Sequence, residues 1–195
     1  MSFNIVRVDD VKPQPWKNGG GVTRELLAWP SAESWRVRIS VADIEKDGPF
    51  SSFPGIKRTI TVLSGAGIRL DSPINVRLRP KDPPFTFSGE HAPRCDLVSG
   101  PTRDLNAMFD QRDGAGRMQR WRTACNTRRK WVSFVSDTHP PLMFCIFTLD
   151  AATLLTRTEE IALPAMSLAW IEGCPPEMQL HSNPQAWAIY YTDHP

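Results

Sequence analysis

Prolines recur along the whole chain, and their spacing constrains the fold more than any other feature of the sequence. The 195 residues contain 18 prolines and 12 glycines. A proline inside a helix removes a backbone hydrogen bond and clashes with the preceding turn, whereas short strands place prolines in turns and at sheet edges. An apolar fraction of 41% with 23% charged residues is typical of a globular protein with a buried core. The sequence therefore predicts an all-β fold.

Alternating apolar and polar residues predict the individual strands. In the clearest alternation, at residues 35–41, one face is apolar and the other carries Arg36, Arg38 and Ser40. If that polar face meets solvent, Arg36 and Ser40 have no special role; if it lines the mouth of a barrel, these two side chains contact a ligand. Residues 104–109 are the segment most compatible with a short helix. Further strands are expected at residues 3–8, 56–63, 131–135, 142–149, 167–171 and 186–191.

The strand predicted at residues 56–63 places a cation, Arg58, on an otherwise apolar face. An isolated buried charge is costly, so Arg58 either extends its head group to water or meets an anion. That anion is either a ligand or a protein carboxylate such as Glu25 or Asp104. The sequence leaves these outcomes open.

Three consecutive glycines lie in the segment WKNGGGVTRE at residues 16–25. Without Cβ atoms, the backbone can adopt positive φ and approach a ligand closely. The N–H groups of such a turn can bind an anion, and Lys17 would add a positive charge. Neither phosphate-binding fingerprint fits, because the lysine precedes the glycines and no helix is expected after them. The pattern alone therefore favours a tight turn between two strands in which Lys17 and Arg24 face solvent.

Four blocks of the sequence resemble the HutD/Ves family. They are residues 16–25, residues 34–42, the loop DGPFSSFPG at residues 47–55 and the segment DLNAM at residues 104–108. Their number and order make the resemblance specific for about the first 110 residues. The resemblance implies a cupin-like fold of the RmlC-like jelly-roll type, in a bacterial protein associated with histidine utilisation.

The rhythm of strands and turns continues through the second half of the chain without a recognisable sequence repeat. Together with the length and the resemblance, it predicts two tandem barrels, a bicupin, that share or swap edge strands. Residues 1–112 are expected to form an N-terminal cupin-like half that carries the WKNGGG pocket. Residues 113–195 are expected to form a C-terminal cupin-like half, packed with the first as one globular unit.

The resemblance implies a small carboxylate ligand, such as a formylated or formiminated glutamate, and a regulatory role in histidine utilisation. A binding site needs N–H groups and cations for the carboxylate, amides and hydroxyls for other polar groups, and aromatic rings that exclude water. The candidate residues are Trp16, Lys17, Asn18, Gly19, Gly20, Gly21, Thr23, Glu25, Arg36, Ser40, Phe50, Ser51, Phe53, Arg58 and Asn106. The alternative is a metal-free cupin enzyme acting on a small acidic metabolite, with Glu25, Lys17 and Asp104 as acid–base candidates.

The histidines do not fit the metal site of metal-dependent cupins. Those proteins hold a transition metal with two histidines one residue apart, a glutamate and a more distant histidine. The four histidines of this chain include no such pair, so we expect neither a metal nor a cofactor. The four cysteines are widely spaced and include no CxxC pair, which favours free and mostly buried thiols.

The charge distribution bears on the choice of partner. A formal net charge of +2 gives no general reason to expect a nucleic-acid or membrane partner. Residues 112–131 carry seven basic side chains with two tryptophans among them, a pattern of single-strand nucleic-acid binding. Acidic residues elsewhere balance that charge, so a solvated connector is favoured over nucleic-acid binding. No secretory signal or membrane span is visible, which predicts a cytoplasmic location; a homodimer remains open.

Overall fold

The computed structural model describes residues 2–121, 140–182 and 184–193. Within these ranges the regular elements are strands and one three-residue 3-10 helix, η1 (Val8–Asp10). No helix in that part of the chain has the length and apolar character needed to cross a bilayer. The predicted all-β fold is confirmed.

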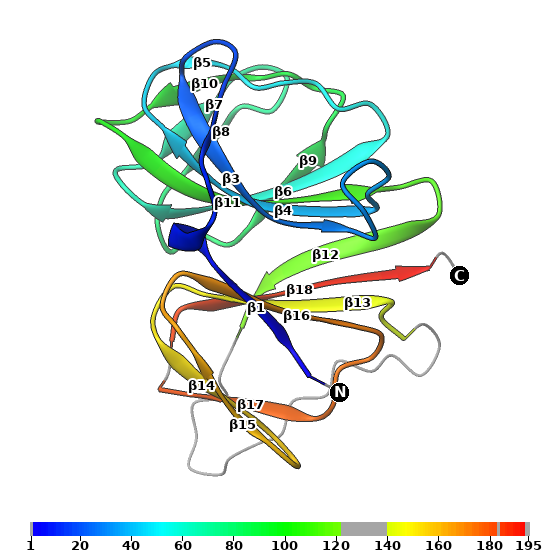
Figure 1. Cartoon of the computed structure of the whole chain (residues 1–195). Coiled ribbons are helices and arrows are strands. Elements are labelled where there is room, and N and C mark those ends of the chain that lie inside the picture. Colours follow the sequence, from blue (N-terminus) through cyan, green and yellow to red (C-terminus); the bar gives the residue numbers. More distant parts are fainter. Residues whose placement is uncertain (1, 122–139, 183, 194–195) are drawn as a thin grey trace. The chain divides into compact units, whose positions relative to one another are not determined.

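The chain divides into two compact units (Figure 1). The first unit is Val11–Arg112, and the second unit joins Met1–Asp10 to Asp113–Pro195. The sequence had suggested a division into residues 1–112 and 113–195. The structure differs from this division in the first ten residues, which group with the carboxy-terminal part of the chain.

The amino-terminal strand explains this difference. Strand β1 (Asn4–Arg7) pairs antiparallel with β16 (Ser167–Glu172), from Asn4 opposite Trp170 to Arg7 opposite Ser167. Its backbone hydrogen bonds are therefore made to the second unit, as an edge strand of that unit's larger sheet. A hydrophobic pattern identifies such a strand but does not identify its partner.

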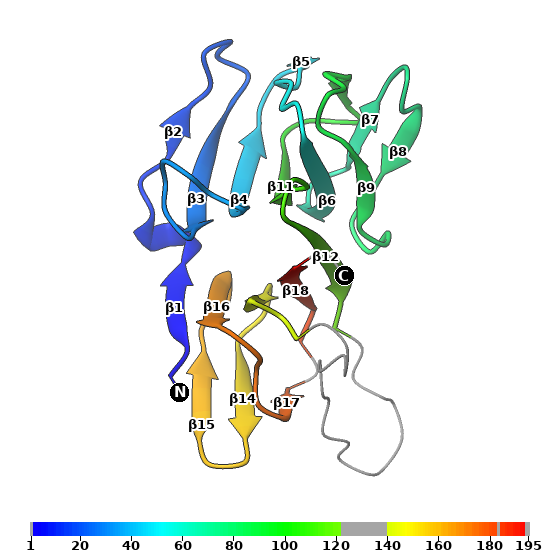
Figure 2. The same ribbon diagram turned by 90° about the vertical axis from the view of Figure 1, so that its right-hand side faces the viewer.

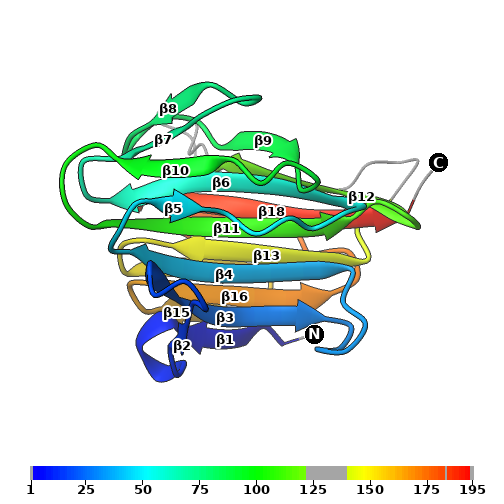
Figure 3. The same cartoon turned by 90° about the horizontal axis from the view of Figure 1, so that it is seen from above.

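Two antiparallel sheets form the first unit. The six-stranded sheet has the order β2 (Gln14–Pro15), β3 (Gly21–Trp29), β4 (Val37–Ile44), β11 (Thr102–Asp110), β6 (Ile56–Ser64) and β9 (Phe85–Ser88). The four-stranded sheet has the order β5 (Gly48–Pro49), β10 (Arg94–Leu97), β7 (Ile68–Leu70) and β8 (Val76–Leu78). The long strands β3, β4, β11 and β6 of the larger sheet can be followed in Figure 3.

Side chains from both sheets meet inside the first unit. Ile60 and Val62 of β6 belong to one apolar cluster with residues of the smaller sheet, namely Ile68, Leu70, Leu78 and Cys95. Because side chains alternate along a strand, Arg58 of β6 points to the same side of the sheet as Ile60 and Val62. The interior between the two sheets is therefore only partly apolar.

Residues 104–109 form a strand, so the expectation of a short helix there was wrong. They lie within β11, which pairs with β4 on one side and with β6 on the other. Alternate side chains of this segment point to opposite faces, and all six are buried. Pairing and burial at the centre of a sheet thus override the weak helical preference of a short segment.

The second unit also contains two sheets. The five-stranded sheet has the order β1, β16, β13 (Met143–Thr148), β18 (Ala186–Asp193) and β12 (Gly114–Arg120). The three-stranded sheet has the order β15 (Glu160–Leu163), β14 (Ala152–Thr156) and β17 (Met178–His181), as Figure 2 shows. The strands predicted at residues 142–149, 167–171 and 186–191 are confirmed as β13, β16 and β18.

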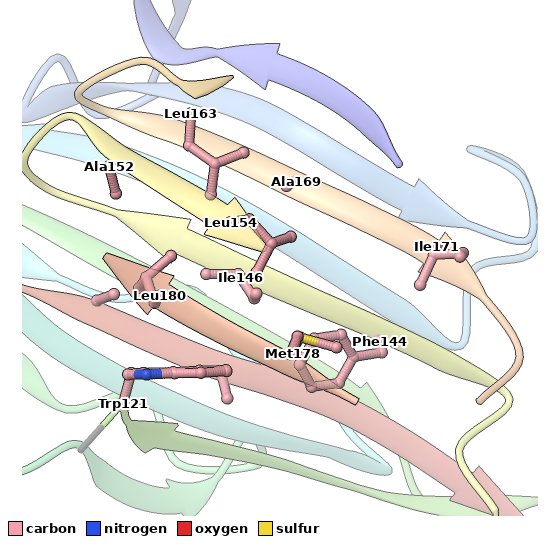
Figure 4. Packing of buried hydrophobic residues seen from close by; sticks show 12 residues of the cluster. Trp121, Phe144, Ile146, Ala152, Leu154, Leu163, Ala169, Ile171, Met178 and Leu180 are labelled. Atoms are coloured by element: carbon pink, nitrogen blue, oxygen red, sulfur yellow. The ribbon is translucent and has the colours of Figure 1, made fainter. Parts of the chain in front are cut away.

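The interior of the second unit is an apolar cluster drawn from both of its sheets. Phe144 and Ile146 of β13 belong to it together with Leu154 of β14 and Met178 of β17, each fully buried. Figure 4 shows these four side chains converging between the strands that carry them. This cluster is a conventional sandwich core.

Some predictions for this half of the chain fall on residues outside the described ranges. These are the strand at residues 131–135, the thiol of Cys125 and residues 122–131 of the basic segment. Two basic residues of the described part, Arg117 and Arg120, lie on β12. Among the described cysteines, Cys95 and Cys145 are free and buried, and Cys174 is free and half-buried. The expectation of free thiols is confirmed for these three.

Candidate functional site

The glycine turn between β2 and β3 forms hydrogen bonds among its own residues. The Trp16 N–H donates to the Gly21 carbonyl at 2.9 Å, and the Gly19 N–H donates to the Trp16 carbonyl at 3.0 Å. The Gly20 N–H donates to Asn18 Oδ1 at 3.0 Å. The N–H groups of Gly19 and Gly20 are thus engaged within the turn instead of being directed at an anion.

The backbone geometry of the turn explains the need for glycine. Gly19 has a φ of 64°, in the left-handed region that side chains disfavour. A Cβ on Gly21 would lie 2.2 Å from the carbonyl oxygen of Asp43, because β3 approaches β4 closely there. Lys17 and Asn18 are exposed. The turn therefore has a structural reason for its glycines that is independent of any ligand.

Trp16 connects this turn to the interior of the first unit. Its Nε1–H donates to Thr23 Oγ1 at 2.7 Å. Its ring meets Phe50 edge to face, with 6.3 Å between the ring centroids, and it packs against the apolar cluster. The aromatic residue of the WKNGGG segment thus faces inward, whereas the lysine faces solvent.

Cross-strand pairing arranges the interior face of the six-stranded sheet into three rows. Across β3, β4, β11 and β6, the rows are Thr23, Ala42, Asp104 and Val62; Glu25, Ser40, Asn106 and Ile60; and Ala28, Arg38, Met108 and Arg58. Neighbouring rows are about 7 Å apart along a strand. The polar members lie in adjacent rows, and we call Glu25, Arg38, Ser40, Arg58, Asp104 and Asn106 the interior cluster.

Aromatic rings surround the Arg58 guanidinium. Its central carbon lies 5.0 Å from the ring centroid of Phe50, 5.7 Å from that of Phe53 and 5.2 Å from that of Phe87. Nη1 donates to the Ser51 carbonyl at 3.3 Å, while Nε is buried without a hydrogen-bond partner. Arg58 is 5% exposed, so the alternative in which its head group extends to water is wrong.

Arg58 remains a cation at neutral pH. Burial lowers the pKa of Arg58 to about 10, and the nearby Asp104 partly opposes that shift. Within the described ranges, Arg58 forms no ion pair with a carboxylate. A buried guanidinium held by rings and one carbonyl can therefore still accept an anionic partner.

Asp104 and Asn106 project from β11 into the same interior. They are 1% and 8% exposed, and the Oδ1 atom of each is buried without a hydrogen-bond partner. Burial raises the pKa of Asp104 to about 7; the Arg58 charge acts against this rise, and the charge of Asp43 adds to it. Since buried polar atoms in native proteins are nearly always paired, unpaired atoms gathered on one face indicate a site.

Glu25 and Arg38 form an ion pair at the edge of the interior cluster. Arg38 Nε donates to Glu25 Oε2 at 2.5 Å, and both side chains are partly exposed. The carboxylate of Glu25 is thus already occupied by a cation, which counts against its predicted role as an acid–base group. Among the residues that the structure describes, no three His, Cys, Asp or Glu side chains gather as a metal site requires.

The structure gathers some of the predicted site residues and separates others. Trp16, Thr23, Glu25, Ser40, Phe50, Phe53, Arg58 and Asn106 face or border the interior of the first unit. Lys17, Asn18 and the side chain of Ser51 are exposed. Arg36 precedes β4, and its carbonyl accepts the Asp110 N–H at 2.8 Å, which places it beyond the third row.

Sequence reasoning left two members of the interior cluster out of the binding site. Arg38 was placed on the polar face of its strand but was not chosen as a contact, and Asp104 was considered only as an acid–base group or as a partner of Arg58. The available signal was alternation: Asp104 is two residues from Asn106, as Arg38 is from Ser40. Treating residues 104–109 as helical concealed it.

Comparisons with known proteins agree with the fold and the motif blocks. The family model described as HutD matches residues 8–189. An uncharacterised 21.2 kDa protein in the hutC 3′ region of Pseudomonas putida is 40% identical over 121 residues, which are 60% of this chain and 63% of that protein. Protein Ves of Citrobacter koseri is 37% identical over 106 residues, which are 51% of this chain and 55% of that protein. The matched part thus spans less than two thirds of the length of these curated relatives.

Solved structures resemble the chain over its whole length. HutD from Pseudomonas fluorescens SBW25 shows 27% sequence identity and a TM-score of 0.79, with 100% of both chains covered. A cupin 2 conserved barrel domain protein from Leptotrichia buccalis shows 10% identity and a TM-score of 0.54, with 100% of this chain and 98% of that chain covered. The second likeness concerns the fold alone and supports the cupin-like architecture. Since the HutD model matches most of the sequence, this chain belongs to the HutD family.

Proposed function

We propose that the first unit binds a small carboxylate of the glutamate type, with Arg58 as the anchor for one carboxylate group. The observation that carries this proposal is the buried Arg58 guanidinium, which has an unpaired Nε and no carboxylate partner among the described residues. Three phenylalanine rings exclude water from it, and a charge-assisted hydrogen bond is stronger in such a dry environment.

The identity of the ligand is proposed from the family. The Pseudomonas putida relative is named for its place in the hutC 3′ region, and the matching family is HutD. A formylated or formiminated glutamate is the ligand class that the association with histidine utilisation suggests. We further propose that the protein regulates histidine utilisation through this binding.

The interior cluster supplies the remaining contacts of the proposed site. The Ser40 hydroxyl and the Asn106 amide lie in one row and offer hydrogen bonds to the second polar group of a ligand. Phe50, whose ring centroid lies 5.0 Å from the Arg58 guanidinium carbon, and Trp16, which meets Phe50 edge to face, supply an apolar wall of the proposed site. Since both units of the chain consist of two facing sheets, we also propose that they are two cupin-like domains, as in a bicupin.

Calorimetric titration with glutarate and with formylated glutamate tests the proposal. We expect Arg58→Gln to weaken binding at least thirtyfold, because it removes a buried charge-assisted bond worth about 2 kcal/mol or more. The matched control is Lys57→Gln, a neighbouring cation of β6 that points to the other face of the sheet. Equal affinities of the two variants would refute Arg58 as the anchor.

A metal-free enzyme acting on a small acid is the second candidate, and the ionisation of Asp104 favours it. A buried carboxyl whose pKa is raised to about 7 can donate and accept a proton near neutral pH. The two functions differ in what happens to the bound acid. Incubation followed by mass spectrometry should return the acid unchanged if the protein only binds it, and chemically altered if the protein is an enzyme.

A further inference from the structure

The interior cluster has more unpaired hydrogen-bond acceptors than unpaired donors. The buried atoms without partners on this face are one donor, Arg58 Nε, and two acceptors, Asp104 Oδ1 and Asn106 Oδ1. The two acceptors are two residues apart on β11, so both side chains point the same way. A ligand that fills this site must therefore present a carboxylate to Arg58 and N–H donors to β11.

A simple dicarboxylate meets only half of this requirement. Its oxygens can accept from Arg58, but they cannot donate to Asp104 or Asn106, and they would repel the Asp104 carboxylate. A neutral amide offers a single N–H group. An amidinium group offers several N–H donors and a positive charge that matches a buried carboxylate.

We propose that Asp104 and Asn106 select, among acids held by Arg58, those that also carry a cationic N–H group. The first unit then prefers a formiminated acid, which carries an amidinium, to the corresponding formylated acid, which carries an amide. This inference rests on the proposed binding at Arg58 and names the ligand class within it.

The charges around Asp104 determine when the preference operates. Asp104 interacts electrostatically with the charges of Arg58 on β6 and Asp43 on β4. Its own charge contributes to the raised pKa of the Cys95 thiol on β10. A bound amidinium adds a cation beside Asp104 and so favours its ionised form. Because the pKa of Asp104 in the free protein is about 7, the preference should be largest above that pH and should shrink as Asp104 takes up a proton.

Calorimetry at pH 8 on the full chain, with formiminated glutamate, formylated glutamate and glutarate as the probes, tests this selection. We expect the formiminated acid to bind at least tenfold more tightly than the formylated acid. Asp104→Asn should reduce that ratio to below about threefold and should raise the glutarate affinity, since it removes a buried negative charge from the interior cluster. Asp96→Asn, at a half-buried carboxylate of β10 that pairs with Arg69 and Arg94, is the control and should keep the ratio.

The outcomes separate this inference from the proposed function. Equal binding of the two modified glutamates, or a ratio that survives both Asp104→Asn and Asn106→Ala, overturns the selection while Arg58-dependent binding stands. If none of the three probes binds, the proposed function fails and the inference fails with it. A thermal melt of each variant verifies folding, and a tenfold ratio at pH 8 that falls at pH 6 supports the assignment to Asp104.

Discussion

The two units enclose different interiors between their sheets. In the second unit, the clustered side chains among the described residues are apolar, with Phe144, Leu154 and Met178 at 0% exposure. In the first unit, an apolar cluster of comparable kind adjoins Arg58 and Asp104, which are buried with unpaired polar atoms. Apolar burial stabilises a fold, whereas unpaired buried polar atoms cost free energy. The second unit also contains buried polar atoms without partners, at Arg120 and Trp187, but among the described residues only the first unit buries an unpaired carboxylate oxygen near a cation, Asp104 near Arg58. This charged interior is costly for stability, and it is the interior in which we place the proposed binding site.

The largest effect is expected in the apolar interior. Phe144→Ala removes a fully buried ring from the core of the second unit and should lower the free energy of unfolding by about 3–5 kcal/mol. The affinity of the folded protein for a dicarboxylate should not change, because the contacts of the first unit stay intact. Urea denaturation followed by tryptophan fluorescence measures the first quantity, and calorimetry measures the second.

A matched variant sharpens this test. Ile161 packs against the same cluster but is only partly buried, so Ile161→Ala should cost clearly less than Phe144→Ala. A loss of ligand affinity in Phe144→Ala, at a temperature where the variant remains folded, would contradict the proposed location of the binding site in the first unit.

The second prediction concerns the charged interior and has the opposite sign. Asp104→Asn should raise the free energy of unfolding at pH 8 by about 2–3 kcal/mol, because it replaces a buried carboxylate with a neutral side chain of the same shape. Loss of the attraction to Arg58 limits the gain. A destabilised Asn variant at pH 8 would show that Asp104 serves the fold and not a ligand.

The pH dependence of the parent protein provides an independent measurement. The pKa of Asp104 is about 7 in the folded chain and 3.8 as the ordinary value, so the folded state holds this proton more tightly. The stability that protonated Asp104 contributes to the folded state is fully present below about pH 4 and is lost as the pH rises to about 7. The gain from Asp104→Asn should accordingly vanish at pH 4, which paired urea titrations at pH 4 and pH 8 can establish.

The sequence could predict those features of the two interiors that depend on local patterns, but not those that depend on the pairing of distant strands. Alternation placed Arg58 on an apolar strand face, and proline spacing excluded a helical bundle; both are local patterns that a chain carries wherever it folds. Arg38 was not chosen as a contact because its importance lies in the register that places it in one row with Met108 and Arg58. Asp104 was left out for a different reason, since residues 104–109 were expected to be helical. Register is a property of paired strands and is not written in either strand alone.

The glycine turn is a second case in which the sequence predicted the local conformation but not the hydrogen-bond partners. Three glycines correctly indicated a tight turn. The sequence did not show that the N–H groups of Gly19 and Gly20 bond to acceptors within the turn itself. Likewise, β1 pairs with β16, a strand far away in the sequence, and a local hydrophobic pattern does not identify which strand pairs with which. Except at residues 104–109, local patterns predicted the backbone conformation of these segments, whereas the pairing of distant strands could not be predicted from them.

Ion pairs of the two units allow a third and smaller test. Glu25→Gln breaks the partly buried pair with Arg38 and should cost about 1 kcal/mol, whereas Glu177→Gln breaks an exposed pair with Arg157 and should cost at most about 0.5 kcal/mol. Glu25→Gln should also tighten dicarboxylate binding, because it removes a negative charge from the interior cluster. Weaker binding would instead assign Glu25 a direct role toward the ligand.

The smallest effect is expected at Lys17, which the sequence proposed as a ligand contact. Lys17 is exposed, and the N–H groups of Gly19 and Gly20 beside it bond within the turn, so an anion held there would meet a single solvated charge. Lys17→Ala should change the free energy of unfolding by less than about 0.5 kcal/mol and the dicarboxylate affinity by less than about threefold. Trp16→Phe, one residue earlier, loses the bond to Thr23 and should cost about 1 kcal/mol. Calorimetric titration of both variants with a dicarboxylate tests this prediction. A tenfold weakening by Lys17→Ala would place the ligand carboxylate at the surface turn instead of the interior of the first unit. The unpaired atoms around Arg58 would then need another explanation.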